Sequence, residues 1–223
     1  MSALAEASVD EVVVAAEASA WRDAGFRVDG GDAPVAHVGA AAIALAGAAA
    51  GKRIVHCSLR GIESDSFDGL PIARSESRAP ATAPAPPHPN GVVAIDHLVA
   101  FTPDLDRTVA AGKALGLDLR RIRDEPAPAG SPRQAFFRLG DLILEIAQAP
   151  PGSQLQPDSP ARFYGLAFLV EDVDVTATAL GDLCGDPRDA VQPGRRIATV
   201  RKQANLGLPV AFMTPPAVVV PLR

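Results

Sequence analysis

Hydrophobic and polar residues follow the same order twice in the second half of the chain. Each copy begins with a largely apolar run rich in Val, Leu and Phe, at residues 94–101 and 163–170, and continues into a segment with helical periodicity. Such runs are typical of strands, and Thr102 and Asp172 are suitable N-terminal caps for the two helices. After each helix the pattern indicates one short extended piece and a pair of strands. The predicted unit is therefore β-α-β-β-β.

The two copies can be aligned at two places. AIDHLVAFTPDLD, residues 94–106, aligns with FYGLAFLVEDVD, residues 163–174, at the Asp-X-Asp endings, which places Asp104 on Asp172. FFRLGDLILEI, residues 136–146, aligns with ANLGLPVAFM, residues 204–213, at a shared Leu-Gly, which places Gly140 on Gly207. The two alignments have nearly the same offset along the chain, which indicates an internal duplication.

Domain boundaries are predicted from proline content and from the repeat. RAPATAPAPPHPN, residues 78–90, is too rich in proline for a helix or a central strand and predicts an extended linker. The two units of the main domain are predicted at residues 91–148 and 161–215. Residues 1–77 are a truncated, weaker version of the unit, with a further apolar strand at residues 53–62 that opens another unfinished unit. The predicted fold class is α+β.

Composition and charge narrow the class of protein. The chain has 223 residues, of which 48% are hydrophobic, and a formal net charge of −5, as expected for a soluble globular protein. Its basic residues are scattered, so we expect no nucleic-acid partner. No apolar run is long enough to span a bilayer and no signal peptide is recognisable, so we expect a cytoplasmic protein without a membrane partner. Cys57 and Cys184 are expected to be free structural thiols.

His97 and Glu145 lie in motifs that resemble those of a known family. IDHLVAFTPDLD around His97 and RLGDLILEI around Glu145, within a duplicated βαβββ unit, resemble the vicinal oxygen chelate superfamily, which includes glyoxalases, bleomycin-resistance proteins and ring-cleaving dioxygenases. The resemblance covers residues 91–215 and is closest to glyoxalase-like proteins without an assigned reaction. It implies curved mixed sheets around a cleft, in which the first and last strands of each unit bind a divalent metal.

The resemblance implies only half of such a metal site. His97 and Glu145 take the ligand positions of the first unit, whereas the two alignments place Gly165 and Phe212 at the corresponding positions of the second unit. Neither residue can bind a cation, and metal sites that stay open to substrate usually keep about three protein ligands. We therefore expect either no cofactor or a weakly held divalent metal.

The chemistry of His97 and Glu145 has three interpretations. His97 is a hydrogen-bonded residue of the strand interior, or it acts with Glu145 as a general base without a metal, because a carboxylate orients the imidazole. Alternatively, the two bind a metal completed by water, substrate or a distant residue such as His56. In every case Glu145 needs a partner, since an unpaired carboxylate in an apolar strand is costly. His97 and Arg138 are the candidate partners.

Ligand-binding residues of the cleft are predicted partly by the resemblance and partly because arginine binds carboxylates in a bidentate geometry. The predicted set is Gln134, Phe136, Arg138, Arg196 and Phe212.

Three functions are compatible with these residues. One is a non-catalytic module that binds a small organic molecule, which the missing ligands of the second unit favour. Another is a metal- or His/Glu-dependent lyase, isomerase or dioxygenase. The third is a structural protein whose N-terminal unit mediates dimerisation. We expect a homodimer, because the truncated N-terminal unit leaves a sheet edge that needs covering.

Overall fold

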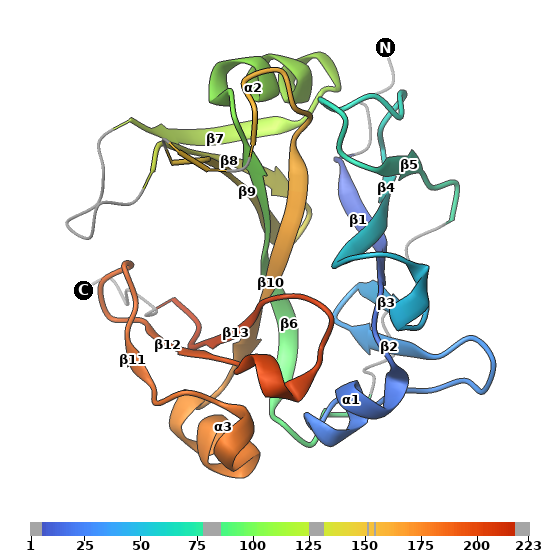
Figure 1. Cartoon of the computed structure of the whole chain (residues 1–223), viewed down its shortest axis with the longest axis vertical. Helices are drawn as coiled ribbons and strands as arrows, with labels where there is room; N and C mark the ends of the chain where they lie inside the picture. The colour runs from blue at the N-terminus through green and yellow to red at the C-terminus, as the bar shows by residue number, and fades with distance from the viewer. Residues whose placement is uncertain (1–5, 78–85, 125–131, 151, 154, 217–223) are drawn as a thin grey trace, which may run out of the picture.

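Two β-sheets packed against each other form the framework of the protein (Figure 1). The structure is a computed structural model that describes residues 6–77, 86–124, 132–150, 152–153 and 155–216. The larger sheet has eight strands in the order β11-β12-β13-β10-β6-β9-β8-β7, and the smaller has five in the order β2-β3-β1-β4-β5. The predicted α+β class is confirmed.

The eight-stranded sheet consists of two units with the predicted β-α-β-β-β order. The first unit contains β6 (Val92–Thr102), α2 (Leu105–Ala114), β7 (Asp118–Arg123), β8 (Gln134–Leu139) and β9 (Leu142–Gln148); the second contains β10 (Arg162–Val170), α3 (Val173–Leu180), β11 (Arg188–Asp189), β12 (Arg196–Thr199) and β13 (Val210–Met213). Strands β6 and β10 pair antiparallel at the centre, and each closing strand, β9 or β13, pairs parallel with the opening strand of its own unit. The sheet curves, so that its two ends approach each other in Figure 1.

Equivalent aspartates begin the helices of the two units. Asp104 accepts a hydrogen bond from the backbone N–H of Arg107 at 3.0 Å, and Asp172 accepts one from that of Asp174 at 2.8 Å. The prediction of Asp172 as a cap is confirmed. The prediction of Thr102 is wrong, because Thr102 is still the last residue of β6. The two caps support the alignment of Asp104 with Asp172.

The five-stranded sheet has a reduced version of the same topology. Its elements are β1 (Ser8–Val14), α1 (Ala18–Asp23), β2 (Val35–Val38), β3 (Ala41–Leu45), β4 (Ile54–Arg60) and β5 (Ile72–Arg74). Strands β1 and β4 form the antiparallel central pair, with β3 parallel to β1 and β5 parallel to β4. The apolar strand predicted at residues 53–62 is β4. Most of the predicted linker, residues 78–85, lies outside the described residues.

A shared hydrophobic core joins the two sheets. Trp21 of α1 is fully buried, with its ring centroid 4.7 Å from that of Phe26 and 6.2 Å from that of Phe168 on β10. Cys57 and Cys184 are buried free thiols, and burial raises the pKa of Cys57 to about 12. No helix in the described part of the chain is long and apolar enough to cross a membrane. Through the contacts of Trp21, the smaller sheet covers the face of the larger one that points away from the concave side (Figure 1).

Candidate functional site

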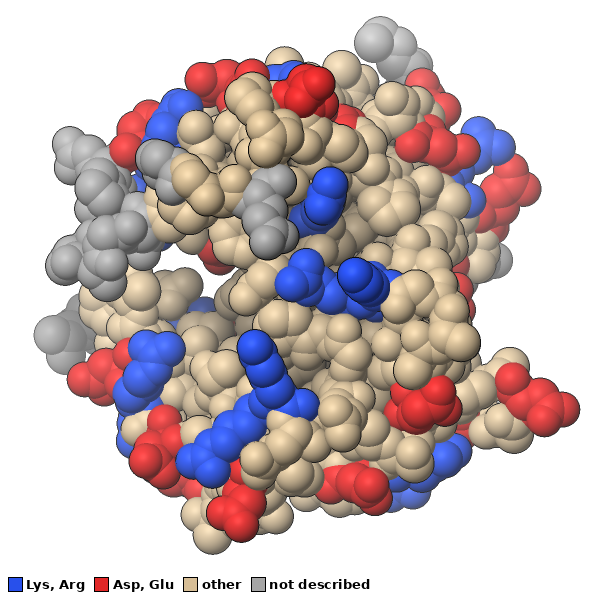
Figure 2. Space-filling model, viewed as in Figure 1, with Lys and Arg blue, Asp and Glu red and all other residues tan. Residues whose placement is uncertain are grey.

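A small cavity lies between the two units of the eight-stranded sheet. Its volume is about 180 Å³. The first unit contributes His97, Arg123, Gln134, Phe136 and Glu145, and the second contributes Arg188, Ala190, Val191, Gln192, Ile197 and Met213. Figure 2 shows the surface hollowed at the left, between the upper part of the molecule, which carries β7 to β9, and the lower part, which carries β11 and β12.

A β-bulge in β6 brings two successive side chains together beside this cavity. The pairing of β6 with β10 skips Asp96, because Ala167 pairs with His97 and the next residue, Phe168, pairs with Ile95. In a regular strand the side chains of residues 96 and 97 would point to opposite faces of the sheet, but a bulge interrupts this alternation. His97 Nδ1 consequently lies 2.7 Å from Asp96 Oδ2.

Asp96 is held by a buried arginine. Arg195 places Nη2 2.7 Å from Asp96 Oδ1 and Nη1 3.3 Å from Oδ2, and its Nε–H donates to the carbonyl oxygen of Thr214. Burial opposes ionisation of Asp96, but hydrogen bonds from His97 and Arg195 outweigh it and lower the pKa of Asp96 below its usual 3.8. An ionised Asp96 can accept a hydrogen bond from the Nδ1–H of His97, and in that tautomer the imidazole lone pair lies on Nε2. Sequence reasoning missed both Asp96 and Arg195.

Glu145 on β9 has two partners at the cavity. Its Oε1 accepts a hydrogen bond from the side-chain amide of Gln134, and its Oε2 lies 3.9 Å from His97 Nε2. Within the described residues, Oε1 of Gln134 is buried without a hydrogen-bond partner. Arg138, the other expected partner, instead lies 3.3 Å from Glu6 and donates to the carbonyl oxygen of Gly140. Of the two expected partners of Glu145, His97 therefore lies near its carboxylate and Arg138 does not.

In the second unit, Gly165 stands at the position that corresponds to His97. The bulges of the two central strands, at Asp96 in β6 and Tyr164 in β10, are separated along the chain by the same interval as the two helix caps. A Cβ atom at Gly165 would lie 2.5 Å from the carbonyl oxygen of Pro209. Backbone therefore occupies the space that a ligand side chain would need.

The register of the sheet corrects the alignment of the closing strands. Val99 pairs with Glu145 in the first unit, and Ala167, the counterpart of Val99, pairs with Ala211 in the second. Glu145 therefore corresponds to Ala211 and not to Phe212. Like Phe212, Ala211 cannot bind a metal, so the second half of the site lacks a donor at this strand as well.

Phe212 points to the other face of the sheet. It is fully buried, and its ring centroid lies 6.4 Å from that of Phe168 and 6.3 Å from that of Phe26 in the core between the sheets. The expectation that Phe212 lines the cleft is therefore wrong. Met213, the next residue, lines the cavity in its place.

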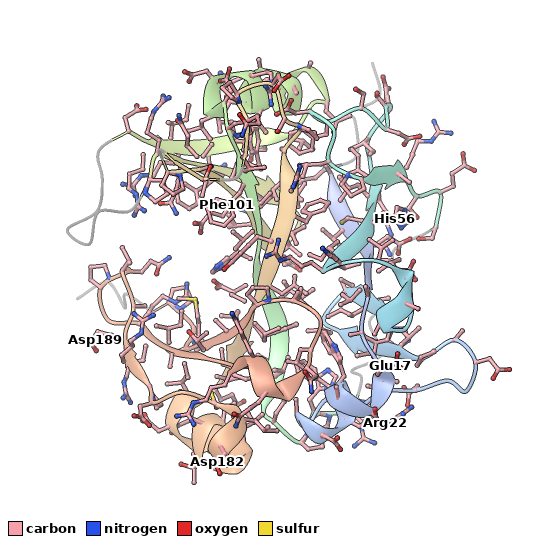
Figure 3. All side chains as sticks on the ribbon, viewed as in Figure 1. Glu17, Arg22, His56, Phe101, Asp182 and Asp189 are labelled. Carbon is pink, nitrogen blue, oxygen red and sulfur yellow. The ribbon has the colours of Figure 1, made fainter. Side chains whose placement is uncertain are left out.

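The remaining candidates divide between the cavity and other surfaces. Gln134 and Phe136 line the cavity, whereas Arg196 is half-exposed and forms an ion pair with Asp174 of α3. His56 lies on β4 in the smaller sheet, away from the concave side of the larger sheet (Figure 3), and contacts the hydroxyl group of Ser58 at 3.2 Å. His56 therefore does not complete a site with His97.

The side chains at the cavity supply an incomplete donor set for a divalent cation. His97 and Glu145 are close enough to bind one ion together, but Gly165 and Ala211 carry no donor atom. The described residues contain no group of three or more His, Cys, Asp and Glu side chains arranged for a metal. The residues present thus fit half of the metal site that the resemblance implies.

Similar proteins are found by comparison of structures. No protein-family model matches it, and no curated protein matches its sequence. Methylmalonyl-CoA epimerase from Mycobacterium tuberculosis superposes on 56% of this chain and 90% of its own, with 17% identity and a TM-score of 0.45. Streptomyces coelicolor methylmalonyl-CoA epimerase in complex with 2-nitronate-propionyl-CoA covers 56% of this chain and 99% of its own, with 22% identity and a TM-score of 0.43.

A third similarity extends over the whole chain. A xylose isomerase-like TIM barrel/4-hydroxyphenylpyruvate dioxygenase fusion protein covers 99% of this chain and 50% of its own, with 12% identity and a TM-score of 0.62. This chain therefore spans about half the length of that protein, and the similarity concerns the fold. Together with the paired βαβββ units, it shows that the chain has a glyoxalase-like fold.

Proposed function

We propose that the protein binds a small organic ligand in the cavity between its paired βαβββ units, without a complete metal site. The observation that carries the proposal is the unequal contribution of the two units. The first unit offers His97, Glu145 and Gln134, whereas the described lining residues of the second include no His, Cys, Asp or Glu, and its counterpart of His97 is a glycine closed off by Pro209. The cavity of about 180 Å³ is smaller than the usual range of roughly 300–1,000 Å³, which favours a compact ligand.

Metal analysis of the purified protein tests the absence of a complete metal site. We expect far less than one transition-metal ion per chain in the wild-type protein, and no difference in His97→Ala or in the control His56→Ala. Stoichiometric metal that is lost in His97→Ala and retained in His56→Ala would contradict the proposal.

Thermal unfolding in the presence of small apolar and carboxylate compounds tests ligand binding itself. A compound that binds the folded state raises Tm by mass action. We expect at least one chemical class to raise Tm, and a panel in which no class does so would count against a ligand-binding cavity.

A His97- and Glu145-dependent lyase, isomerase or dioxygenase is the second candidate, and one contact favours it. Asp96, 2.7 Å from His97 Nδ1, would hold the imidazole with Nε2 ready to accept a proton from a ligand in the cavity, the arrangement that general-base catalysis requires. Loss of turnover in both His97→Ala and Asp96→Asn, at unchanged ligand affinity, would separate catalysis from binding.

The expected homodimer remains part of the proposal. The support for it is that the smaller sheet has two open edges, at β2 and β5, whose unpaired backbone groups a second subunit could cover. Light scattering of the purified protein should give twice the 23.0 kDa mass of one chain, and a mass of one chain would refute the dimer.

A further inference from the structure

Two arginines from opposite ends of the eight-stranded sheet line the same cavity. Arg123 is the last residue of β7 and Arg188 the first residue of β11, and these strands are the two edges of the sheet. These edge strands are far apart in strand order, but the curvature of the sheet brings its two ends toward each other (Figure 1). Both arginine side chains line the cavity together with His97. Each βαβββ unit thus contributes one guanidinium group.

Neither guanidinium group has an acidic partner within the described residues. Nearby arginines are paired: Arg133 with Asp106 and Asp124, Arg195 with Asp96, and Arg196 with Asp174. No comparable ion pair involves Arg123 or Arg188 in the described part of the chain.

In the part of the chain that the structure describes, Arg123 has a buried donor without an acceptor, and Arg188 is an exposed residue at the rim of the cavity. The Nε–H of Arg123 is buried and has no acceptor among the described residues. A buried donor without an acceptor is costly, which makes a ligand atom a favourable partner. Asp189, beside Arg188, lies on the outer side of β11 in Figure 3, as the alternation of a strand requires when Arg188 faces the cavity.

The charges at the cavity leave room for one anionic group. Asp96 is neutralised by Arg195, and Glu145 is the one acidic side chain among the lining residues. Arg123 and Arg188 together outweigh it by one positive charge when His97 is neutral. Guanidinium groups favour carboxylates because their planar N–H donors match the two carboxylate oxygens.

The rest of the lining favours an apolar body attached to that group. Phe136, Ile197 and Met213 line the cavity, and Val191, with 57% of its surface exposed, stands beside them. Together these apolar side chains are well suited to contact a hydrocarbon part of a ligand.

We propose that the ligand is a small organic monocarboxylate, whose carboxylate binds between Arg123 and Arg188 and whose apolar part contacts Phe136, Ile197 and Met213. This inference rests on the proposed ligand-binding function and names the chemical class of its ligand. Glu145 and His97 then lie at the uncharged side of the ligand, where a second carboxylate would be repelled.

Pairs of compounds that differ only in charge test the inference. We suggest measuring binding of benzoate and benzamide, and of propionate and propionamide, to the full-length protein by ligand-observed NMR titration. We expect each acid to bind about tenfold more tightly than its amide, the usual advantage of a hydrogen bond to a charged group. Arg123→Gln and Arg188→Gln should each remove most of this preference and leave amide binding unchanged.

Matched variants control for general loss of charge or structure. The controls are Arg120→Gln and Arg196→Gln. Arg120 lies on the same strand as Arg123 but pairs with Asp118 at the surface, and Arg196 lies on β12, next to β11. Both should retain the preference for acids. Far-UV circular dichroism identifies any variant that does not fold, and Arg188, on an exposed edge strand, provides a second variant should Arg123→Gln fail to fold.

The outcomes separate the inference from the proposed function. Amides that bind as tightly as the acids, or an acid preference that survives both Arg123→Gln and Arg188→Gln, would overturn the monocarboxylate inference and leave ligand binding intact. If neither member of either pair binds, ligand binding in the cavity fails as well.

Discussion

Gly165 determines what the second unit can hold at its ligand position. The carbonyl oxygen of Pro209 lies where a side chain would begin, and it also accepts a hydrogen bond from the backbone N–H of Leu166 at 3.1 Å. Elsewhere, a ligand lost from a duplicated site can be restored by changing one residue back. At Gly165 the backbone of Pro209 occupies the space of a side chain, so the two units differ in backbone position as well as in sequence.

We predict that even the smallest side chain at this position is destabilising. Gly165→Ala places a Cβ atom 2.5 Å from Pro209 O and should lower the free energy of unfolding by about 1–3 kcal/mol, the usual cost of overpacking. Urea denaturation followed by circular dichroism measures the change.

Gly31→Ala is the matched control for this substitution. A Cβ atom at Gly31 has no neighbour within 4 Å, so this variant should be neutral or stabilised by up to about 1 kcal/mol. Equal stabilities of Gly165→Ala and the wild-type protein would mean that Pro209 moves aside and that the position is open.

Asp96 connects the site to the stability of the second unit. Its carboxylate and the guanidinium of Arg195 are both largely buried, with 14% and 8% of their side-chain surfaces exposed. Asp96→Ala would leave the arginine buried without its counter-charge, which typically costs about 3–5 kcal/mol.

An exposed ion pair provides the control for Asp96→Ala. Asp118→Ala removes the partner of Arg120, at a site where both side chains are about half-exposed, and should change the free energy of unfolding by less than about 1 kcal/mol. Urea titrations of the two variants give both values. Similar losses in the two would show that Arg195 finds another partner.

At the scale of elements, the order of strands could be predicted and their exact alignment could not. The central strands β6 and β10 and the closing strand β9 are long, largely apolar and bounded by turn residues, so their presence follows from local sequence, whereas β11 has only two residues, both exposed. In the first unit a tight turn joins β8 directly to β9, but in the second, residues 200–209 connect β12 to β13. This longer connection, with its short helix at Lys202–Ala204, shifts the closing strand and made Phe212 a mistaken counterpart of Glu145.

The strand residues of the candidate site could be predicted from the sequence, and the residues placed by the bulge and by the curvature of the sheet could not. His97, Glu145, Gln134 and Phe136 meet at the cavity because they lie on strands whose pairing follows from the repeat. The role of Asp96 depends on a bulge that has no local sequence signal, and the presence of Arg123 and Arg188 depends on the curvature of the whole sheet.

The segment that enters β6 contains a histidine between the two sheets. His88 is 7% exposed; its Nδ1 accepts the backbone N–H of Arg27 at 2.9 Å, and its Nε2 lies 3.0 Å from the carbonyl oxygen of His37. One nitrogen must accept and the other donate, so the ring is neutral. Burial lowers the pKa of His88, partly opposed by the His37 carbonyl.

Folding stability should therefore fall in mild acid. The unfolded chain takes up a proton at His88 near pH 6.5, before the folded protein does, so the contribution of His88 is complete above about pH 6.5 and is lost as the pH falls below it. Urea unfolding at pH 7.5, 6.5 and 5.5 should show this loss, and His88→Gln should reduce the slope between pH 6.5 and 5.5. His56→Gln, a substitution in the smaller sheet, should retain it. An unchanged slope in His88→Gln would assign the pH dependence to another group.

At the scale of the whole molecule, the two sheets share one core, with Trp21 at their contact. Trp21 is the single tryptophan of the chain; it packs against Phe168 of the larger sheet, and its Nε1–H donates to the carbonyl oxygen of Leu206 at 3.2 Å. The smaller sheet thus packs against the face of the larger sheet that lies opposite to the cavity.

We predict that the two sheets unfold together. Trp21 fluorescence reports the contact between the sheets, and far-UV circular dichroism reports all strands and helices, so a cooperative unit gives one urea midpoint by both methods. Phe212→Leu, a substitution in the shared core, should lower both midpoints equally, because it removes packing that both sheets use. A fluorescence midpoint clearly below that from circular dichroism would mean that the smaller sheet detaches first, and that the eight-stranded sheet and its cavity can persist without it.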